Sequence, residues 1–260
     1  MEEKVLLEKR ERIGWVWINR PSIRNAIDKE TAIRMREGIL SFYDDKDVSV
    51  IAIGGKGGHF SSGAELKRED GVDGVSGSHE VRIRSIYQGI ILAIRDCPKP
   101  VVALVQGYAT GFGCDIALSC DLRLASKSAK FSEIFVSLSL VPDGGGSYNL
   151  PRIVGLGRAL ELMFTGRFVT ADEALSMGLV NAVYDDENFY ESAEAYIKEI
   201  ANKSTFALER IKRAVYSSLE ESFIESLIRE ARFQEQCILN EDFKKKLKEF
   251  FEKRKGVRNA

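Results

Sequence analysis

The chain has 260 residues, a hydrophobic share of 44% and a formal net charge of −1, from 38 basic and 39 acidic residues. This length and composition provide for one large domain, or one domain with an appendage, and they argue against a disordered chain. The even charge balance argues against a protein that binds nucleic acid through bulk positive charge.

The cysteines and the start of the chain bear on metal sites and location. Four cysteines occur without a CxxC pair and only two histidines are present, which disfavours a Cys/His zinc site. Scattered cysteines fit a reducing cytosol, and the charged start MEEKVLLEKRERIG lacks the apolar segment of a signal peptide. The most apolar stretch, Val101 to Cys120, contains Gln106, Asp115 and several glycines. We therefore expect a cytoplasmic protein without membrane or nucleic-acid partners.

The first third of the chain predicts a hairpin, a helix and a buried strand. VLLEKRERIGWVWINR predicts strands at Val5–Glu8 and Trp15–Ile18. Asp28 is expected to cap a helix that runs to about Tyr43. VSVIAIGG has the continuous apolar pattern of a strand buried on both faces. Apolar residues between 81 and 94 then recur at helical spacing.

The remainder of the chain changes character near residue 185. CPKPVVALVQG predicts a strand, followed by glycines, a short helix and two strand-like segments, DLRLAS and AKFSEI. Residues 186–254 contain no proline and consist of amphipathic runs rich in helix-forming residues. The sequence thus predicts an α/β core over residues 1–185 and a helical region over residues 186–260.

Two glycine-flanked loops stand out once familiar motifs are tested. The P-loop, GxGxxG and HExxH patterns are absent, and GVSGSH departs from GxSxG. The remaining loops are SSGAEL (61–66) and YATGFGCD (108–115), each leading toward a predicted helix whose first N–H groups lack partners. Two such N–H groups aimed at one point would stabilise a negative oxygen. The alternative is that these glycines only make tight turns.

Four segments in order resemble the crotonase superfamily, also called the enoyl-CoA hydratase/isomerase family. They are NRPSIRNAI, GGHFSSGAEL, GYATGFGCDIALSCDLRLAS and LVPDGGGSYNLPRIVGLGRALELMFTGRFVTADEALSMGLVN, with a weaker match at FFEKRK. The resemblance implies a spiral of ββα units and a C-terminal helical trimerisation region, assembled as a homotrimer or a dimer of trimers. It also implies an acyl-CoA thioester substrate, with coenzyme A as part of the substrate and no separate cofactor or metal.

The resemblance also implies roles for individual residues. The N–H groups of Ala64 and Phe112 would form an oxyanion hole for the thioester carbonyl. Phe112 stands where many relatives have glycine, so its side chain is expected to narrow or redirect the acyl pocket. The residues implied to contact coenzyme A are Arg24, Ala26, Ala64, Leu66, Phe250 and Lys253.

The acidic residues distinguish the reactions of this family. Hydration asks for a water between two carboxyl groups, one acting as base and one as acid. Typical hydratases carry two glutamates; the first position is Asp115 here, and the second is Phe135, which cannot transfer a proton. Glu133, if on a strand, would share the face of Phe135 at about 6.6 Å along it. The alternative for Glu133 is a surface position.

Asp143 stands between Pro142 and three glycines. In family branches with an acid at this place, such as dienoyl-CoA isomerases, that acid works on the substrate. The alternative is that Asp143 only caps a helix starting near Ser147 or earlier. The resemblance favours isomerisation of an enoyl-CoA double bond, with Asp143 as base and shuttle and Asp115 as second acid. Phe135 would make the site drier and raise the pKa of an acid.

Two other functions stay open at this point. One is enoyl-CoA hydration, with Asp143 or Glu133 replacing the missing glutamate beside Asp115. Thioester hydrolysis is a weaker variant, because the Pro-Glu pair usual in that branch is Ile134-Phe135 here. The other is a non-catalytic acyl-CoA-binding protein, which would need no acids facing the acyl chain.

Overall fold

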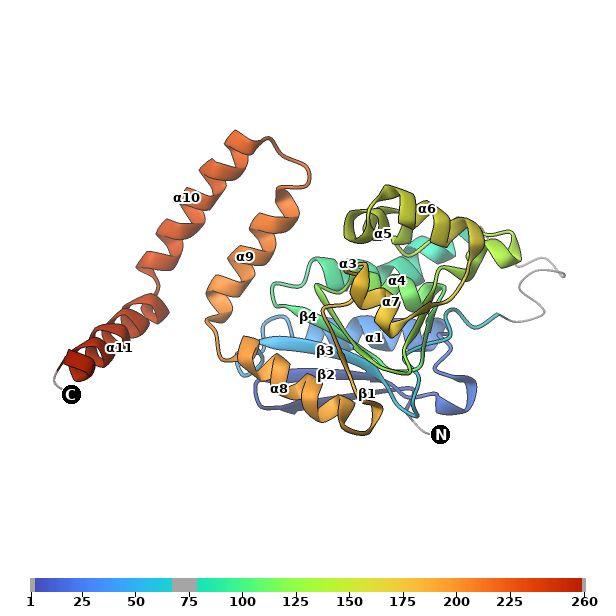
Figure 1. The fold of residues 1–260 in the computed structure, drawn as a ribbon, viewed down its shortest axis with the longest axis horizontal. Coiled ribbons are helices and arrows are strands. Elements are labelled where there is room, and N and C mark those ends of the chain that lie inside the picture. The colour runs from blue at the N-terminus through green and yellow to red at the C-terminus, as the bar shows by residue number, and fades with distance from the viewer. Residues whose placement is uncertain (1–2, 67–78, 259–260) are drawn as a thin grey trace. The chain divides into compact units, whose positions relative to one another are not determined.

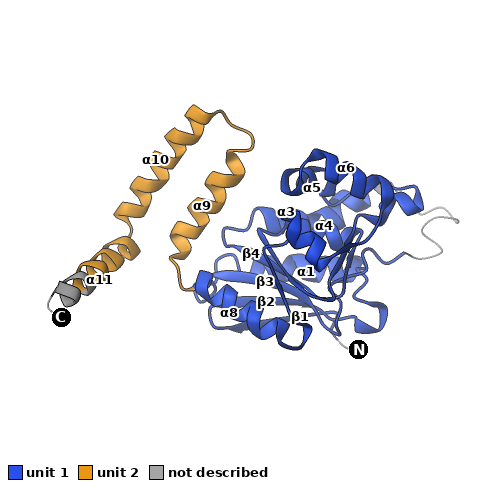
Figure 2. Cartoon of the chain, in the orientation of Figure 1, with its two compact units in different colours: residues 1–201 blue, residues 202–260 orange. Residues whose placement is uncertain are grey.

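The computed structural model describes residues 3–66 and 79–258, and the side chains among them other than those of residue 79 and residues 253–258. The chain divides into two compact units, residues 1–201 and 202–260 (Figure 2). The first unit contains both β-sheets, and the second contains only helices.

A six-stranded sheet forms the centre of the first unit (Figure 1). Its strands lie in the order β1 (Val5–Arg10), β2 (Ile13–Ile18), β3 (Val50–Gly55), β4 (Val101–Val105), β6 (Leu122–Ser126) and β9 (Ala182–Tyr184). The pair β1–β2 is antiparallel, and the other neighbours are parallel. The expected hairpin therefore forms, with longer strands. Its turn is Glu11–Arg12, both at positive φ, as a tight hairpin turn with the twist of its strands requires.

A second, three-stranded sheet consists of β5 (Tyr108–Thr110), β7 (Lys130–Ser132) and β8 (Val169–Thr170). The strand predicted in AKFSEI ends at Ser132, where the N–H of Gly111 donates to the Ser132 carbonyl at 2.9 Å. Beyond it, Ile134–Leu138 forms a 3-10 turn, η4. Glu133 and Phe135 therefore do not lie on a strand, and the placement of Glu133 by strand alternation is wrong.

Two hydrophobic layers cover the faces of the six-stranded sheet. Alternation along β2 sends Val16 and Ile18 to one layer and Trp15 and Trp17 to the other. The first layer is completed by α1 (Lys29–Ser41), α3 (Gln88–Arg95) and α4 (Phe112–Ser119). The N-cap predicted at Asp28 is confirmed, because its side chain accepts a hydrogen bond from the Thr31 N–H at 2.8 Å.

Helix α8 (Phe189–Ala201) completes the second layer and belongs to the first unit. Its apolar face, which includes Phe189 and Ile197, is buried against Trp15 and Trp17 of β2. The division of the chain therefore falls after Ala201, later than the boundary at 185 expected from the change in sequence character. A helix-rich composition marks where strands end, but it does not tell which helices pack on the sheet.

The remaining helices follow the predicted pattern. The helical run before β4 begins with α2 (His79–Arg82) and a π-helical turn, η3 (Ile83–Tyr87). The other elements are η1 (Pro21–Ile23), α5 (Gly146–Val154), α6 (Leu156–Thr165), α7 (Ala171–Ser176), η5 (Asp186–Asn188), α9 (Thr205–Ser217), α10 (Phe223–Leu239) and α11 (Glu241–Arg258). Among the described residues, no helix is both long enough and apolar enough to span a bilayer.

Candidate active site

The segment 61–66 is held in an extended conformation beside Ile27. The Ile27 N–H donates to the Gly63 carbonyl at 2.8 Å, and the Glu65 N–H donates to the Ile27 carbonyl at 2.9 Å. Ile27 and Ala64 thus form a parallel bridge. The Gly63 carbonyl and the Ala64 N–H belong to the same peptide group, in which they point in opposite directions. Because the carbonyl points toward Ile27, the N–H of Ala64 points away from it.

The beginning of α4 lies against this segment. Gly63 has a φ of 99°, and a Cβ there would lie 2.7 Å from the Thr110 carbonyl oxygen and 3.4 Å from the Phe112 nitrogen. Only glycine allows this approach. Phe112 is the first residue of α4, where backbone N–H groups have no partner within the helix. The structure therefore brings Ala64 and Phe112, the two predicted oxyanion donors, into adjacent segments.

The Phe112 side chain fills space between two neighbouring segments. Its ring is buried and lies edge-on to Tyr87 of η3, with 5.3 Å between the ring centroids. A Cβ at Gly144 would lie 2.8 Å from Phe112 Cε2, so the ring also packs against the loop that carries Asp143. The Phe112 ring thus contacts both η3 and the loop that carries Asp143.

Asp115 lies in the first turn of α4 and has no exposed surface. Its Oδ2 accepts a hydrogen bond from the Gly144 N–H at 2.9 Å, whereas Oδ1 has no hydrogen-bond partner among the described residues. Burial raises the pKa of Asp115 well above its ordinary value, and the charge of Glu133 raises it further, while the Gly144 N–H lowers it in part.

Glu133 is only 3% exposed, so the surface position considered for it is wrong. Neither carboxyl oxygen has a hydrogen-bond partner of good geometry among the described residues. The Cys114 thiol lies beside the carboxyl group, but a thiol is a weak donor. Burial raises the pKa of Glu133 to about 7, and Cys114 offsets part of this rise.

Asp115 and Glu133 meet at Gly146, the first residue of α5. Asp115 Oδ1 and Glu133 Oε2 both lie within 3.0 Å of the point where a Cβ of Gly146 would stand. The two oxygens are therefore separated by less than twice that distance. Both oxygens face the same backbone position, and the charge of Glu133 raises the pKa of Asp115, so the two carboxyl groups interact electrostatically.

Asp143 lies in the loop before α5 and is partly exposed. Gln88 donates from Nε2 to the Asp143 carbonyl oxygen at 2.9 Å, which ties the loop to α3. Helix α5 begins at Gly146 with Gly145 as N-cap and no side-chain cap, so the capping role considered for Asp143 is wrong. Burial raises the pKa of Asp143, and its charge raises the pKa of both Asp115 and Glu133.

Phe135 belongs to η4, and its ring lies next to the turn that leads into α4. A Cβ at Gly111 would lie 3.9 Å from Phe135 Cζ, so the ring stands next to the residue that precedes the predicted donor Phe112. Gly111 has a φ of 52°, which lets the chain leave β5 and enter the helix. The family resemblance implies a second glutamate at this position in typical hydratases, and this chain has the apolar ring of Phe135 there.

The predicted coenzyme A contacts fall in both units. Arg24 lies over the Tyr108 ring, with 5.4 Å from its guanidinium carbon to the centroid, and Leu66 is 65% exposed. The Ser62 N–H donates to the Arg24 carbonyl at 2.9 Å, so the segments carrying Arg24 and Ala64 are adjacent. Phe250 is on α11 in the second unit and is 53% exposed. Lys253 belongs to α11, and its side chain lies outside the described residues.

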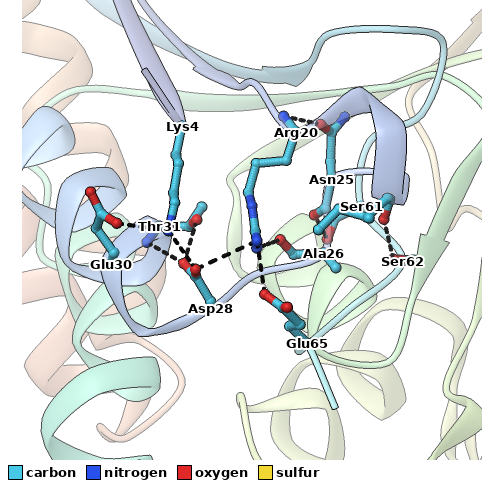
Figure 3. Close-up of polar contacts among 11 residues, drawn as sticks. Lys4, Arg20, Asn25, Ala26, Asp28, Glu30, Thr31, Ser61, Ser62 and Glu65 are labelled. Carbon is cyan, nitrogen blue, oxygen red and sulfur yellow. Dashed lines mark hydrogen bonds and ion pairs between the residues drawn. The ribbon is translucent and has the colours of Figure 1, made fainter. Parts of the chain in front are cut away.

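A charged network that was not predicted from the sequence supports the segment next to Ala64 (Figure 3). Arg20 forms ion pairs with Glu65 at 2.8 Å and Asp28 at 3.5 Å, and donates to the Ala26 carbonyl at 2.6 Å. Lys4 forms an ion pair with Asp28 at 2.6 Å. Burial alone would raise the pKa of Asp28, but hydrogen bonds from Lys4 and Thr31 outweigh it and lower this pKa well below its ordinary value.

Asn25 links the same network to the chain after β3. This buried residue has a φ of 57° and donates from Nδ2 to the carbonyl oxygens of Lys56, at 2.9 Å, and His59, at 2.6 Å. Its Oδ1 accepts from the Arg20 N–H at 2.8 Å. The NRPSIRNAI motif therefore serves the site mainly by holding the segment 61–66, a role that the motif alone does not reveal.

The acids near α5 do not form a metal site. Among the residues that the structure describes, no group of three or more His, Cys, Asp or Glu side chains is arranged to hold a metal ion. The cysteines in the described part of the chain are free thiols, and Cys114 is buried.

Comparison with known proteins identifies the family of the chain. A sequence model of the enoyl-CoA hydratase/isomerase family matches residues 8–258. The chain belongs to this family. It is 32% identical to the crotonyl-CoA hydratase of Syntrophomonas wolfei over 98% of this chain and 97% of that protein. It is 33% identical to the short-chain-enoyl-CoA hydratase of Clostridium acetobutylicum, with 98% of each covered.

Solved structures of this family share the fold. The crystal structure of an enoyl-CoA hydratase from Bacillus anthracis superposes with a TM-score of 0.90 at 27% identity, covering 96% of this chain and 97% of that one. A putative enoyl-CoA hydratase/isomerase from Mycobacterium abscessus gives a TM-score of 0.89 at 25% identity, with 96% of each chain covered. The expected crotonase-like α/β spiral with C-terminal helices is confirmed.

Proposed function

We propose that this enzyme moves a double bond in an unsaturated acyl-CoA thioester. The observation that supports migration is the different exposure of the three acids. Asp115 and Glu133 are buried, whereas Asp143 is partly exposed and can meet a substrate. Migration needs one carboxyl group that takes a proton from one carbon and returns it to another, whereas hydration needs two at the attacking water.

The proposed reaction begins with the thioester carbonyl between the N–H groups of Ala64 and Phe112. The Asp143 carboxylate removes a proton from a carbon made acidic by the carbonyl, and the electron pair moves into the conjugated chain to give a dienolate. The two N–H groups stabilise its oxygen, each by about 3–4 kcal/mol. Asp143 then returns the proton to a different carbon, while Asp115, the second acid, stays protonated and does not take the migrating proton. Coenzyme A is part of the substrate, and the reaction requires no separate cofactor.

Hydration of an enoyl-CoA is the second candidate. It is supported by the names of the relatives from Syntrophomonas wolfei and Clostridium acetobutylicum. It is also supported by the position of Glu133, which supplies a second carboxyl group beside Asp115 although Phe135 replaces the usual one. In this reaction Asp143 and the Asp115–Glu133 pair would hold the water and transfer its protons.

Mass spectrometry and ultraviolet absorbance in D₂O separate these candidates. A 3-enoyl-CoA and crotonyl-CoA are offered in separate tubes. Deuterium uptake into a rearranged 3-enoyl thioester, without addition of water, is the expected result. Addition of water to crotonyl-CoA without migration in the other tube would make hydration the function. Binding of both thioesters without any exchange of protons would contradict both and indicate a non-catalytic acyl-CoA-binding protein.

We also propose that the enzyme is a homotrimer or a dimer of trimers. The second unit carries large apolar side chains with much exposed surface, which a partner copy would bury. They include Phe223, Ile224, Leu227, Ile228 and Leu239. Light scattering coupled to size-exclusion chromatography is expected to give three or six times the chain mass of 29.1 kDa. A monomer at micromolar concentration would contradict this assembly.

A further inference from the structure

Three buried oxygens near α5 lack a hydrogen-bond partner of good geometry among the described residues, although the Gly146 N–H lies beside Asp115 and the Cys114 thiol lies beside Glu133. They are Oδ1 of Asp115 and both carboxyl oxygens of Glu133. A buried carboxylate without a partner is costly, because water no longer solvates its charge. Two such carboxylates side by side would add their mutual repulsion. The arrangement is therefore stable only if the pair carries fewer than two negative charges.

Among the described residues, the titratable groups that act on Asp115 and Glu133 are acidic. The titratable groups that face this pair are Cys114 on α4 and Asp143 in the loop before α5, and both become negative when they ionise. Helix α5 contributes the N–H of Gly146, and the loop contributes the N–H of Gly144. Among the described residues no basic side chain forms an ion pair with Asp115 or Glu133. A proton held by one of the two carboxyl groups would lower the negative charge of the pair.

We propose that Asp115 and Glu133 share one proton across Gly146, and that Glu133 thereby keeps Asp115 in its acid form. Asp115 Oδ1 and Glu133 Oε2 both face Gly146, so these are the oxygens that would carry the proton. Asp115 Oδ2 remains bonded to the Gly144 N–H, which fixes the orientation of the carboxyl group. Glu133 is thus a positioning residue that acts through Asp115. The raised pKa values of both acids agree with a shared proton.

The consequence for turnover rests on the proposed function. Asp143 must be ionised to remove the migrating proton, which it then returns to a different carbon. The neighbouring acid Asp115 must therefore stay protonated, so that it does not take this proton from Asp143. The proton on the buried pair keeps Asp115 in that neutral state.

Infrared spectroscopy tests the shared proton without any reference to activity. The carbonyl stretch of a protonated carboxyl group is distinct from the stretches of a carboxylate, and at pH 8 ordinary aspartates and glutamates are ionised. The native enzyme is expected to retain a protonated-carboxyl band at pH 8 that is absent in Asp115→Asn. In Glu133→Gln the midpoint at which this band disappears should fall by about 1 pH unit or more. Glu187→Gln, an exposed change on η5, should leave the band unchanged.

Gly146→Ala provides a second variant that keeps both acids. Its methyl group would stand within 3.0 Å of both oxygens and separate them. The band at pH 8 should therefore weaken as it does in Glu133→Gln. Circular dichroism of each variant shows whether it is folded. A native enzyme without the band at pH 8, or a Glu133→Gln variant with an unchanged midpoint, would overturn the shared proton.

The pH profile of kcat tests the role in turnover. Glu133→Gln should move the alkaline limb of kcat to lower pH by the same amount as the infrared midpoint, with little change in KM. An infrared shift without any shift in the kcat profile would overturn the catalytic role while leaving the shared proton intact. An enzyme with neither isomerase nor hydratase activity would overturn the proposed function, and the infrared result would still decide the pair.

Discussion

Two groups of acids in the first unit lie in opposite electrostatic surroundings. Asp28 and Glu65 contact Lys4 and Arg20, and hydrogen bonds and charge lower the pKa of Asp28 despite its burial. Asp115 and Glu133 have no such partners among the described residues, and burial raises the pKa of both. The first group is a structural brace, and the second is poised to exchange protons.

The comparison shows that residue type alone does not set the task of a carboxyl group. The ion pair of Glu65 with Arg20 holds the segment that carries Ala64, and the lowered pKa of Asp28 keeps that acid ionised at neutral pH (Figure 3). The unbraced acids lie against the backbone of Gly144 and Gly146, and no basic side chain among the described residues pairs with them. Both groups serve one site, because one positions a backbone donor and the other lies within reach of the charge of Asp143, the proposed base.

The largest expected effect on kcat comes from replacing Asp143, which is the partly exposed member of the three acids at the candidate site. Asp143→Asn should lower kcat by about 10²–10⁴-fold, the range typical of general acid–base groups, with a much smaller change in KM. Steady-state kinetics with the 3-enoyl-CoA measures both constants. Asp172→Asn, an exposed change on α7, should leave kcat unchanged. Full activity of Asp143→Asn would remove Asp143 from the mechanism.

The unbraced acids should make the fold less stable as the pH rises. Between the ordinary pKa of 4.5 and about 7, folded Glu133 holds a proton that the unfolded chain has released. The free energy of unfolding should therefore fall across this range, by roughly 2–3 kcal/mol. Glu133→Gln should flatten most of this fall, leaving the part that belongs to Asp115. Urea unfolding at pH 5 and pH 8 measures the difference, and equal slopes in both proteins would contradict it.

The braced acids should respond to pH in the opposite direction. Because the pKa of folded Asp28 lies below its ordinary value of 3.8, its stabilisation is present above that pH and is lost as the pH falls further. Removing the brace with Arg20→Met should cost about 1–2 kcal/mol of unfolding free energy at pH 7, since Glu65 and Asp28 lose a partner.

Arg34→Met is the matched control for this change. Arg34 pairs with Glu30 at 3.0 Å on the exposed surface of α1, so its loss should cost less than about 1 kcal/mol. Thermal unfolding of the two variants gives the comparison. Arg20→Met should also lower kcat, because Glu65 adjoins the proposed donor Ala64. A variant as stable and as active as Arg34→Met would show that the brace has no role.

The smallest expected effect concerns Cys114, the weak donor beside Glu133. Cys114→Ser places a stronger donor at the same position, which favours the ionised form of Glu133. The midpoint of the protonated-carboxyl band should fall by less than about 1 pH unit. Cys114→Ala removes the donor and should raise the midpoint instead. Shifts of the same sign in both variants would contradict this contact.

The family, most of the secondary structure and the two donor loops could be predicted from the amino-acid sequence. Its apolar periodicity and capping residues act over a few positions, so β3, the Asp28 cap and the C-terminal helices could be predicted from local pattern. The spaced motifs around Ala64, Phe112 and Asp143 sufficed to indicate a carboxyl-bearing site beside two backbone donors.

The burial of each acid and the packing of each helix depend on contacts between distant segments of the chain. Whether Glu133 is buried depends on β7 ending at Ser132 and on α5 starting at a glycine, which no local pattern specifies. The assignment of α8 to the core likewise depends on packing against β2. Burial and pairing are properties of segments brought together from distant parts of the chain, and these set the pKa values on which proton transfer depends.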